Sequence, residues 1–315
     1  MELAVLDLGS TTFHLQHIRV DEIGRFSTTL DLKRSLCLGT QVFSNGFIDG
    51  ASWDACLGAV WELLEASDAA KPARRTIVAT SAIRSASNGA DLIREIERTH
   101  GVEVRMLSPH EEARLAYLGQ SASDAVGGRR VAAVDLGGGS VEIAVGEGTR
   151  CIHATSLAVG ALRVRAQGAR AFGREEARRA AVRIRGVVAA PLREIRALDP
   201  EIVVFGSGSA RAARKLLMRS YSSAGKIGPL DTASFREALN AHLGFTPAQL
   251  IELGVDPARA DSVLAAATIM LEIMDGLGVP HAYVSDKGLR DGAALELYRE
   301  HLARDRQPLA TTAVA

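Results

Sequence analysis

The sequence contains one strand-turn-strand pattern twice, and this duplication constrains the fold more than any other feature. Residues 2–12 and 130–140 align without a gap, at an offset of 128 positions. In each copy an apolar segment ends in Asp-Leu-Gly, and a turn of small residues leads into a second segment, Phe13–Val20 in one copy and Val141–Val145 in the other. The pattern predicts a β-hairpin in both places. It also predicts two similar α/β halves that face each other, with both turns at the cleft where strand ends meet.

Length and composition also favour two domains. The chain has 315 residues, of which 47% are hydrophobic, and this is more than one small core needs. We expect a first domain over residues 1–124, a second over 125–303 and a flexible tail over 304–315. The boundary is placed in the stretch 121–130, which is rich in Ser, Gly and charged residues.

Apolar periodicity predicts helices and strands in both halves. Ser108, followed by Pro109 and two acidic residues, has the form of a helix start. Pro191 is a candidate break within a long helix. The segment Gly206-Ser-Gly-Ser209 is expected to form a turn after a strand. The expected helices cover residues 52–68, 91–99, 174–198, 211–219, 234–243, 257–277 and 290–303, and the expected strands outside the hairpins cover 76–80, 102–107, 201–205 and 281–284.

The charge balance argues against partners that are bound by bulk charge. The chain carries 37 Lys and Arg against 37 Asp and Glu. Neither nucleic acid nor a membrane is therefore expected as a partner, and any polyanion must be met locally. The region from Arg150 to Arg219 does hold fifteen Lys and Arg against five acids. Two interpretations stay open: solvated helix faces, or a basic track for phosphate chains, whose oxygens a planar guanidinium binds in pairs.

Cysteine usage and hydropathy favour a reducing compartment. Cys37, Cys56 and Cys151 lie far apart and are odd in number, which supports neither a disulfide framework nor a zinc cluster. The apolar stretch 263–274 is too short to span a bilayer. The N-terminus runs directly into a strand-like segment without a basic signal sequence. We expect a soluble, cytoplasmic protein.

Three strand-to-turn segments have the residues of a phosphate site. They are Asp7–Thr12, Asp135–Ser140 and Gly206–Ser209, whose glycines let backbone N–H groups approach a ligand and whose hydroxyls lie beside them. Such turns also serve simply to end a strand. Asp7 and Asp135 close the duplicated strands, and a carboxylate beside a phosphate cradle usually holds a cation such as Mg²⁺. The alternative is that each Asp accepts hydrogen bonds from its own turn.

Five motifs then appear in order along nearly the whole chain. They are Asp7-Leu-Gly-Ser-Thr-Thr-Phe-His14, Ala79-Thr-Ser-Ala-Ile-Arg84, Leu107-Ser-Pro-His-Glu-Glu-Ala-Arg-Leu115, Val134-Asp-Leu-Gly-Gly-Gly-Ser-Val-Glu142 and Gly288-Leu-Arg-Asp-Gly292. The set resembles the exopolyphosphatase/guanosine pentaphosphate phosphatase family, within the larger group that includes actin, sugar kinases and heat-shock chaperone ATPases. The resemblance implies two ribonuclease-H-like domains with the active site between them. It also implies that the final helix, 290–303, packs back on the first domain.

The resemblance assigns roles to individual residues. Glu112 matches the catalytic Glu that acts as general base on the attacking water, and Arg84 matches a phosphate-binding Arg. Asp135 and Glu142 match acids associated with the divalent cation, and Asp7 joins them as a metal candidate. The expected cofactor is Mg²⁺, and Mn²⁺ suits the same oxygen ligands. The substrate-binding candidates are Ser10, Thr11, Gly137, Gly138, Gly139, Ser140 and, in two further turns, Gly160 and Gly208.

The chain departs from the family pattern at three positions. Thr11 replaces the usual Asn of the first turn, so a hydroxyl stands where an amide donor is common. Pro109 replaces a Gly before the acidic pair, and His110 stands where an acidic or amide residue is common. The chain also ends where longer members continue into an additional helical domain, so it resembles the short two-domain form.

The resemblance implies metal-dependent, processive hydrolysis of the terminal phosphate of inorganic polyphosphate. The 5′ terminal phosphate of guanosine pentaphosphate is a second expected substrate. Two alternatives remain: an ATPase or kinase of the same fold group, and an inactive sensor that binds polyphosphate or guanosine tetraphosphate. Family precedent also makes a homodimer the expected assembly.

Overall fold

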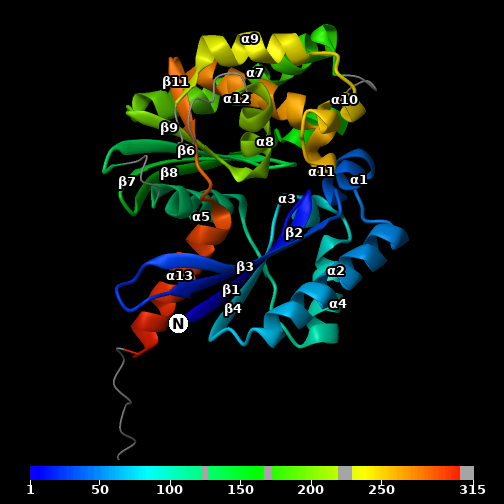
Figure 1. Cartoon of the computed structure of the whole chain (residues 1–315), viewed down its shortest axis with the longest axis vertical. Coiled ribbons are helices and arrows are strands. Elements are labelled where there is room, and N and C mark those ends of the chain that lie inside the picture. Colours follow the sequence, from blue (N-terminus) through cyan, green and yellow to red (C-terminus); the bar gives the residue numbers. More distant parts are fainter. Residues whose placement is uncertain (123–126, 167–171, 219–228, 306–315) are drawn as a thin grey trace, which may run out of the picture.

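The structure is a computed structural model that describes residues 1–122, 127–166, 172–218 and 229–305. It consists of two α/β halves, one stacked on the other (Figure 1). Most of the expected tail, residues 306–315, lies outside the described residues. Within these residues, no helix is both long and apolar enough to cross a membrane.

The first half is built on a sheet of order β3-β2-β1-β4-β5. Strands β1 and β2 form an antiparallel hairpin to which β3 adds an edge, and β4 and β5 run parallel to β1. The strands are β1 Glu2–Leu8, β2 Thr12–Val20, β3 Phe26–Ser35, β4 Arg74–Ala79 and β5 Arg105–Met106, and the helices are α1 Leu38–Asn45, α2 Gly50–Ala69, α3 Ser81–Ser85, α4 Gly89–His100 and α5 Pro109–Ser121.

The second half has a sheet of order β10-β11-β9-β6-β7-β8, in which β6 and β7 form the hairpin and β9 lies parallel to β6. Its strands are β6 Arg130–Leu136, β7 Val141–Glu147, β8 Arg150–Leu157, β9 Ile202–Gly206, β10 Leu230–Asp231 and β11 His281–Val284. Its helices are α6 Ala161–Ala166, α7 Arg174–Ala197, α8 Ser207–Leu217, α9 Thr232–His242, α10 Pro247–Glu252, α11 Pro257–Ala260, α12 Val263–Leu277 and α13 Leu289–Asp305.

The two hairpins are the same structure at the predicted offset. Asp7 pairs with His14 in the first ladder, and Asp135 pairs with Glu142 in the second. Both turns close with the same hydrogen bond, from the first glycine N–H to the carbonyl three residues later, at 3.2 Å in the first and 3.0 Å in the second. In each half the next parallel strand leads directly into a helix, α3 or α8. The repeat confirms the sequence prediction, and the chain folds as two ribonuclease-H-like domains.

Helices α5 and α13 lie between the two sheets (Figure 1). Although α5 precedes the second hairpin in the chain, it packs on β6, β7 and β8, whereas α13 packs on β1 and β4. The two helices touch each other through backbone: a methyl group on Gly119 would lie 1.9 Å from the carbonyl oxygen of Gly288, and one on Gly292 would lie 1.9 Å from that of Leu115. Their apolar side chains join both sheets in one core cluster.

Several local expectations need correction. The strand expected over 102–107 is reduced to β5, and Gly206–Ser209 forms the start of α8 instead of a free turn. Pro191 does not break α7, whose apolar face stays buried along its length although Pro removes one hydrogen bond. The helix expected over 257–277 is interrupted, because Ser262 bonds back to the Arg259 carbonyl through its N–H and its hydroxyl. The edge strand β3, most of whose residues are exposed, was not predicted.

Candidate active site

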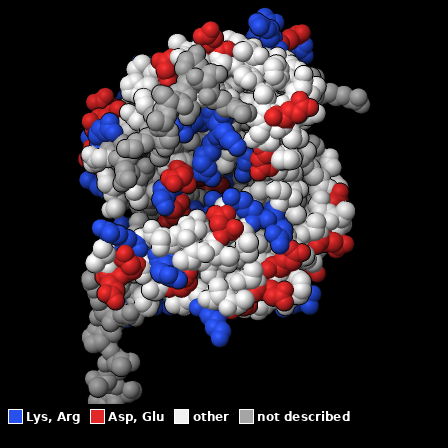
Figure 2. Space-filling model, viewed as in Figure 1, with Lys and Arg blue, Asp and Glu red and all other residues white. Residues whose placement is uncertain are grey.

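A cavity of about 130 Å³ lies between the halves, at the turns of both hairpins. Figure 2 shows Lys and Arg side chains gathered in the hollow between the two halves. The described residues that line the cavity are Asp7, Gly9, Ser10, Thr11, Thr12, His14, Lys33, Thr80, Ser81, Glu112, Asp135, Leu136, Gly137, Gly138, Gly139, Ser140, Glu142, Ser207, Gly208, Ser209, Arg211, Arg259, Asp286, Gly288, Leu289 and Arg290.

The tips of the two hairpins touch. A methyl group on Gly138 would lie 3.1 Å from Cβ of Ser10, and one on Gly139 would lie 2.5 Å from the Ser81 hydroxyl. Glycine is therefore required in the second turn, because a side chain there would push the halves apart. The expectation that the duplicated turns meet at one cleft is confirmed.

Glu112 points into this cavity from the first turn of α5. The helix start is fixed by a capping box: Ser108 Oγ accepts from the Glu111 N–H at 3.2 Å, and the Glu111 carboxylate accepts from the Ser108 N–H at 2.9 Å. Glu112 is only 7% exposed. Arg84 donates to Glu112 Oε2 at 2.8 Å and to the Leu107 carbonyl at 2.7 Å. Arg84 is not among the described residues that line the cavity, so it holds the carboxylate from behind.

Burial changes the acid-base properties of Glu112. Desolvation raises its pKa to about 7, the Arg84 guanidinium opposes the rise, and the negative charges of Asp135 and Asp7 add to it. A carboxylate with a pKa near neutrality can accept a proton at physiological pH and release it again. These are the properties that acid–base catalysis requires of a side chain.

Three further carboxylates surround the cavity. Burial raises the pKa of Asp7, raises that of Asp135 to about 6 with the help of the Asp7 charge, and raises that of Glu142 well above its usual range. Asp7 Oδ2 accepts from Arg290 at 3.1 Å, whereas its Oδ1 is buried and has no hydrogen-bond partner among the residues that the structure describes. Glu142 accepts from the Ser156 hydroxyl at 2.7 Å.

These carboxylates fit a hard cation that shares its coordination with a ligand. Their charges raise one another's pKa, and Asp7 Oδ1 is an unused oxygen ligand. Within the described residues, no three His, Cys, Asp or Glu side chains are grouped closely enough to hold a metal ion. Mg²⁺ is commonly bound through one or two carboxylates together with water and substrate phosphate, so the donor set suits this ion.

The sequence analysis missed most of the cationic lining. Among the described residues, Lys33, Arg211, Arg259 and Arg290 reach the cavity, and of these only Arg290 lies in a motif that the sequence marked. Burial lowers the pKa of Arg211 and of Arg259. Periodicity carries no signal for Arg211 or Arg259, because each is one charged residue on a helix.

Three arginines of α7 form ion pairs outside the cavity. Arg179 pairs with Glu175, Arg183 with Glu176 at 3.2 Å and Arg185 with Glu272 at 3.2 Å, and none of the three lines the cavity.

Helix N-termini add to the positive potential. Both α8 and α13 begin at the cavity wall, where the positive ends of the helix dipoles favour an anion. Ser207 starts α8 with a φ of 88°, a left-handed conformation that favours glycine. Its hydroxyl donates to the Leu136 carbonyl at 2.6 Å, which holds the start of α8 beside the second turn.

The remaining candidates divide into lining and supporting residues. Thr11 lines the cavity and is buried, and Gly208 lines it where a methyl group would meet the Arg259 guanidinium at 2.3 Å. Gly160 is not among the lining residues. It lies behind the second turn, where a methyl group would be 2.5 Å from the Gly138 carbonyl oxygen. His110 is exposed on α5.

Fold and site together define a class: a two-domain ribonuclease-H-like protein whose cleft combines glycine-rich turns, cationic side chains and buried carboxylates. The sequence model of the Ppx/GppA phosphatase family matches residues 18–301. The chain belongs to that family.

Known relatives and structures agree with this assignment. The chain is 28% identical over 305 residues to exopolyphosphatase 1 of Mycobacterium tuberculosis, covering 94% of this chain and 88% of the relative. An exopolyphosphatase structure from Cytophaga hutchinsonii superimposes with a TM-score of 0.86 at 21% identity, over 95% of this chain and 98% of the other. The Ppx/GppA family member of Aquifex aeolicus gives a TM-score of 0.76 at 23% identity, over 98% and 99%. The structures share the fold.

Proposed function

We propose that the protein is an exopolyphosphatase that hydrolyses the terminal phosphate of inorganic polyphosphate in a metal-dependent reaction. The observation that carries the proposal is Glu112, a buried carboxylate with a pKa of about 7 that lines the cavity formed by both glycine-rich turns. The name of the mycobacterial relative, exopolyphosphatase 1, supports the same substrate.

Each group in the cavity has a task in such a reaction. Transfer of a phosphoryl group to water needs an aligned water and stabilised charge more than covalent help. The N–H groups of the two turns would hold the terminal phosphate, and Lys33, Arg211 and Arg290 would neutralise the oxygens of the chain. Glu112 would orient the water and accept its proton at a carboxylate oxygen.

One or two of the carboxylates of Asp7, Asp135 and Glu142 would hold Mg²⁺ together with phosphate oxygens and water. The ion supplies positive charge beside the transferring phosphoryl group and the leaving chain. The pKa values of Asp7, Asp135 and Glu142 are raised in the absence of a cation, so a bound cation also stabilises their ionised forms.

The size of the cavity favours polyphosphate over guanosine pentaphosphate. A volume of about 130 Å³ is small for a nucleoside together with its phosphates, since pockets for ligands of drug size occupy roughly 300–1,000 Å³. The described residues that line it are mostly charged, hydroxylic or glycine, which suits phosphate groups better than the apolar face of a base.

The test is orthophosphate release from polyphosphate, guanosine pentaphosphate and ATP in parallel, with Mg²⁺ present. We expect turnover with polyphosphate, and Glu112→Gln should reduce it by about 10²–10⁴. Glu103→Gln, at an exposed Glu nearby in the chain, is the matched control and should keep wild-type turnover. Wild-type activity in Glu112→Gln would remove the base assigned here. Faster orthophosphate release from ATP or from guanosine pentaphosphate would contradict polyphosphate as the substrate.

A further inference from the structure

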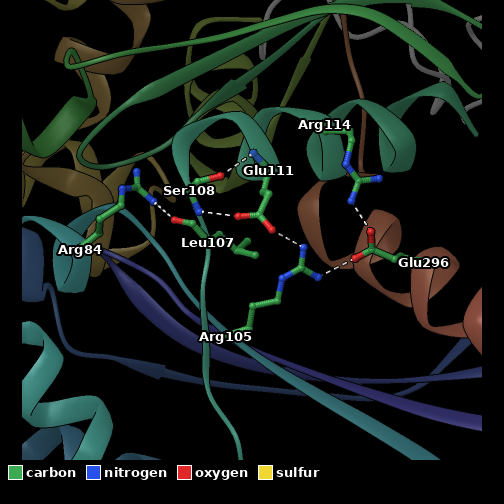
Figure 3. Close-up of polar contacts among 7 residues, drawn as sticks. All are labelled: Arg84, Arg105, Leu107, Ser108, Glu111, Arg114 and Glu296. Carbon is green, nitrogen blue, oxygen red and sulfur yellow. Dashed lines mark hydrogen bonds and ion pairs between the residues drawn. The ribbon is translucent and has the colours of Figure 1, made fainter.

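A chain of ion pairs outside the cavity connects α13 to the start of α5 (Figure 3). Arg105, on β5, donates to Glu111 Oε1 at 2.6 Å and to Glu296 Oε2 at 2.8 Å. Arg114, on α5, pairs with the other oxygen of Glu296. Glu296 therefore binds two guanidinium groups, and Arg105 links it to the first turn of α5.

These ion pairs end at Glu111, the residue that precedes Glu112. Glu111 accepts from the Ser108 N–H at 2.9 Å through the oxygen that Arg105 does not use. On the other side of the same segment, Arg84 binds both the Leu107 carbonyl and Glu112. The residues before α5 are thus held from two sides, and the direction of the first turn decides where the Glu112 side chain points.

Glu111 and Glu296, the two carboxylates of these ion pairs, are ionised at neutral pH. The hydrogen bond from Arg105 and those at the capping box lower the pKa of Glu111 to about 2. Against the effect of burial, the hydrogen bonds from Arg105 and Arg114 lower the pKa of Glu296. Charge-assisted pairs with both oxygens of a carboxylate fix its orientation as well as its position.

Glu296 stands on a helix that cannot easily shift. Gly292 packs against the backbone at Leu115, and Gly119 packs against the backbone at Gly288, so α5 and α13 cross in direct backbone contact. At the cavity end of α13, Arg290 donates to Asp7 at 3.1 Å. Helix α13 thus contributes the guanidinium of Arg290 to the cavity and the carboxylate of Glu296 to the ion pairs with Arg105 and Arg114.

We propose that Glu296 is a positioning residue, which holds Arg105 and, through Glu111, sets the first turn of α5 so that Glu112 faces the cavity. The proposal rests on the proposed function, because it assumes that Glu112 is the base. A base displaced by about 1 Å can lose up to roughly a hundredfold in rate. Loss of one anchor among several should cost less than that.

The first experiment compares Glu296→Gln with Glu300→Gln. Glu300 lies one turn further along α13, is half exposed and pairs with Arg74 at 3.8 Å, which makes it the matched control. With polyphosphate as substrate, Glu296→Gln should lower kcat by about tenfold and change KM by less than about twofold, because positioning of the base acts on the chemical step. Glu300→Gln should match the wild type. A rise in KM at constant kcat overturns the proposal.

A second experiment separates positioning from general destabilisation. In a Glu112→Gln background, Glu296→Gln should have no further effect on residual turnover, because the group that it positions is gone. An equal fold loss in both backgrounds overturns the proposal. Thermal unfolding is measured for every variant. If Glu296→Gln does not fold, Arg105→Lys replaces it, since one ammonium cannot pair with both carboxylates as the planar fork does.

The outcomes distinguish the two proposals. Wild-type turnover in Glu112→Gln removes the proposed function. If Glu112→Gln has impaired turnover but Glu296→Gln and Arg105→Lys turn over polyphosphate as fast as the Glu300→Gln control, only the role of Glu296 is contradicted.

Discussion

Replacing Arg84 by Gln should move the acidic limb of the pH–rate profile to higher pH. Burial raises the pKa of Glu112 to about 7, and the Arg84 guanidinium, 2.8 Å from Oε2, opposes that rise. Glu112 acts as a base only when ionised, so its titration sets the acidic limb. Without the positive charge the ionised form is less stable, and the pKa goes up.

The size of the shift follows from the contact. An opposite charge at this distance lowers a carboxyl pKa by roughly 1–3 units. Even the smallest of these changes would move the pKa of Glu112 from about 7 to ~8. The ionised fraction at pH 7 would then fall from about one half to about one tenth, a loss of about fivefold in rate that is recovered near pH ~9.

The assay is orthophosphate release from polyphosphate between about pH 5 and 10, at fixed saturating Mg²⁺ and substrate. Arg84→Lys keeps the positive charge and serves as the control, with its acidic limb expected to stay close to that of the wild type. A limb that does not move in Arg84→Gln refutes the reasoning. A rate that falls equally at every pH would indicate that Arg84 acts on the phosphate, the role that the sequence motif implied, and not on Glu112.

Four further predictions concern the metal, the second turn, an exposed position on α7 and the contact between the halves. Glu112 and Asp135 have pKa values of about 7 and about 6 in the folded protein, against ordinary values of 4.5 and 3.8. Between the ordinary and the raised pKa values the folded state binds more protons than the unfolded state. The free energy of unfolding of the metal-free protein should therefore fall as the pH rises through this range. Mg²⁺ should then raise the thermal midpoint more at pH ~8 than at pH ~5, and equal shifts would argue against binding at these carboxylates. Gly160→Ala places a methyl group 2.5 Å from the Gly138 carbonyl oxygen and should reduce both turnover and the free energy of unfolding. Gly186 is exposed on α7, where an added methyl group would meet no described atom within 4 Å beyond the backbone of its own helix. Gly186→Ala should raise the free energy of unfolding by about 0.5–1 kcal/mol in denaturant titrations. Arg163 donates to the Gly139 carbonyl at 2.9 Å and lies 4.3 Å from the centre of the Phe43 ring, so it holds the second turn against the first half. Arg163→Gln should raise KM for polyphosphate by roughly three- to tenfold. An unchanged KM would contradict this role.

The sequence predicted the repeated framework because its signals are local. In both places Asp-Leu-Gly ends an apolar strand and a second strand follows a turn of small residues, which predicted the two hairpins; their single offset predicted the paired halves and their meeting turns. Ser108 and Glu111 likewise encode the start of α5 within four residues. The break in the helix expected over 257–277 and the edge strand β3 were missed, because local side-chain bonding and edge position do not alter apolar periodicity.

The sequence by itself therefore determined the two hairpins, the capped helix and the presence of Glu112 on it. Only the tertiary structure decided what that carboxylate can do. Its pKa depends on desolvation by both halves and on charges from Arg84, Asp135 and Asp7, which are brought together from separate strands and helices. The same is true of Arg211 and Arg259, which reach the cavity from α8 and α11. Electrostatic energies depend on distance and burial in three dimensions, and neither is written in the order of residues along the chain.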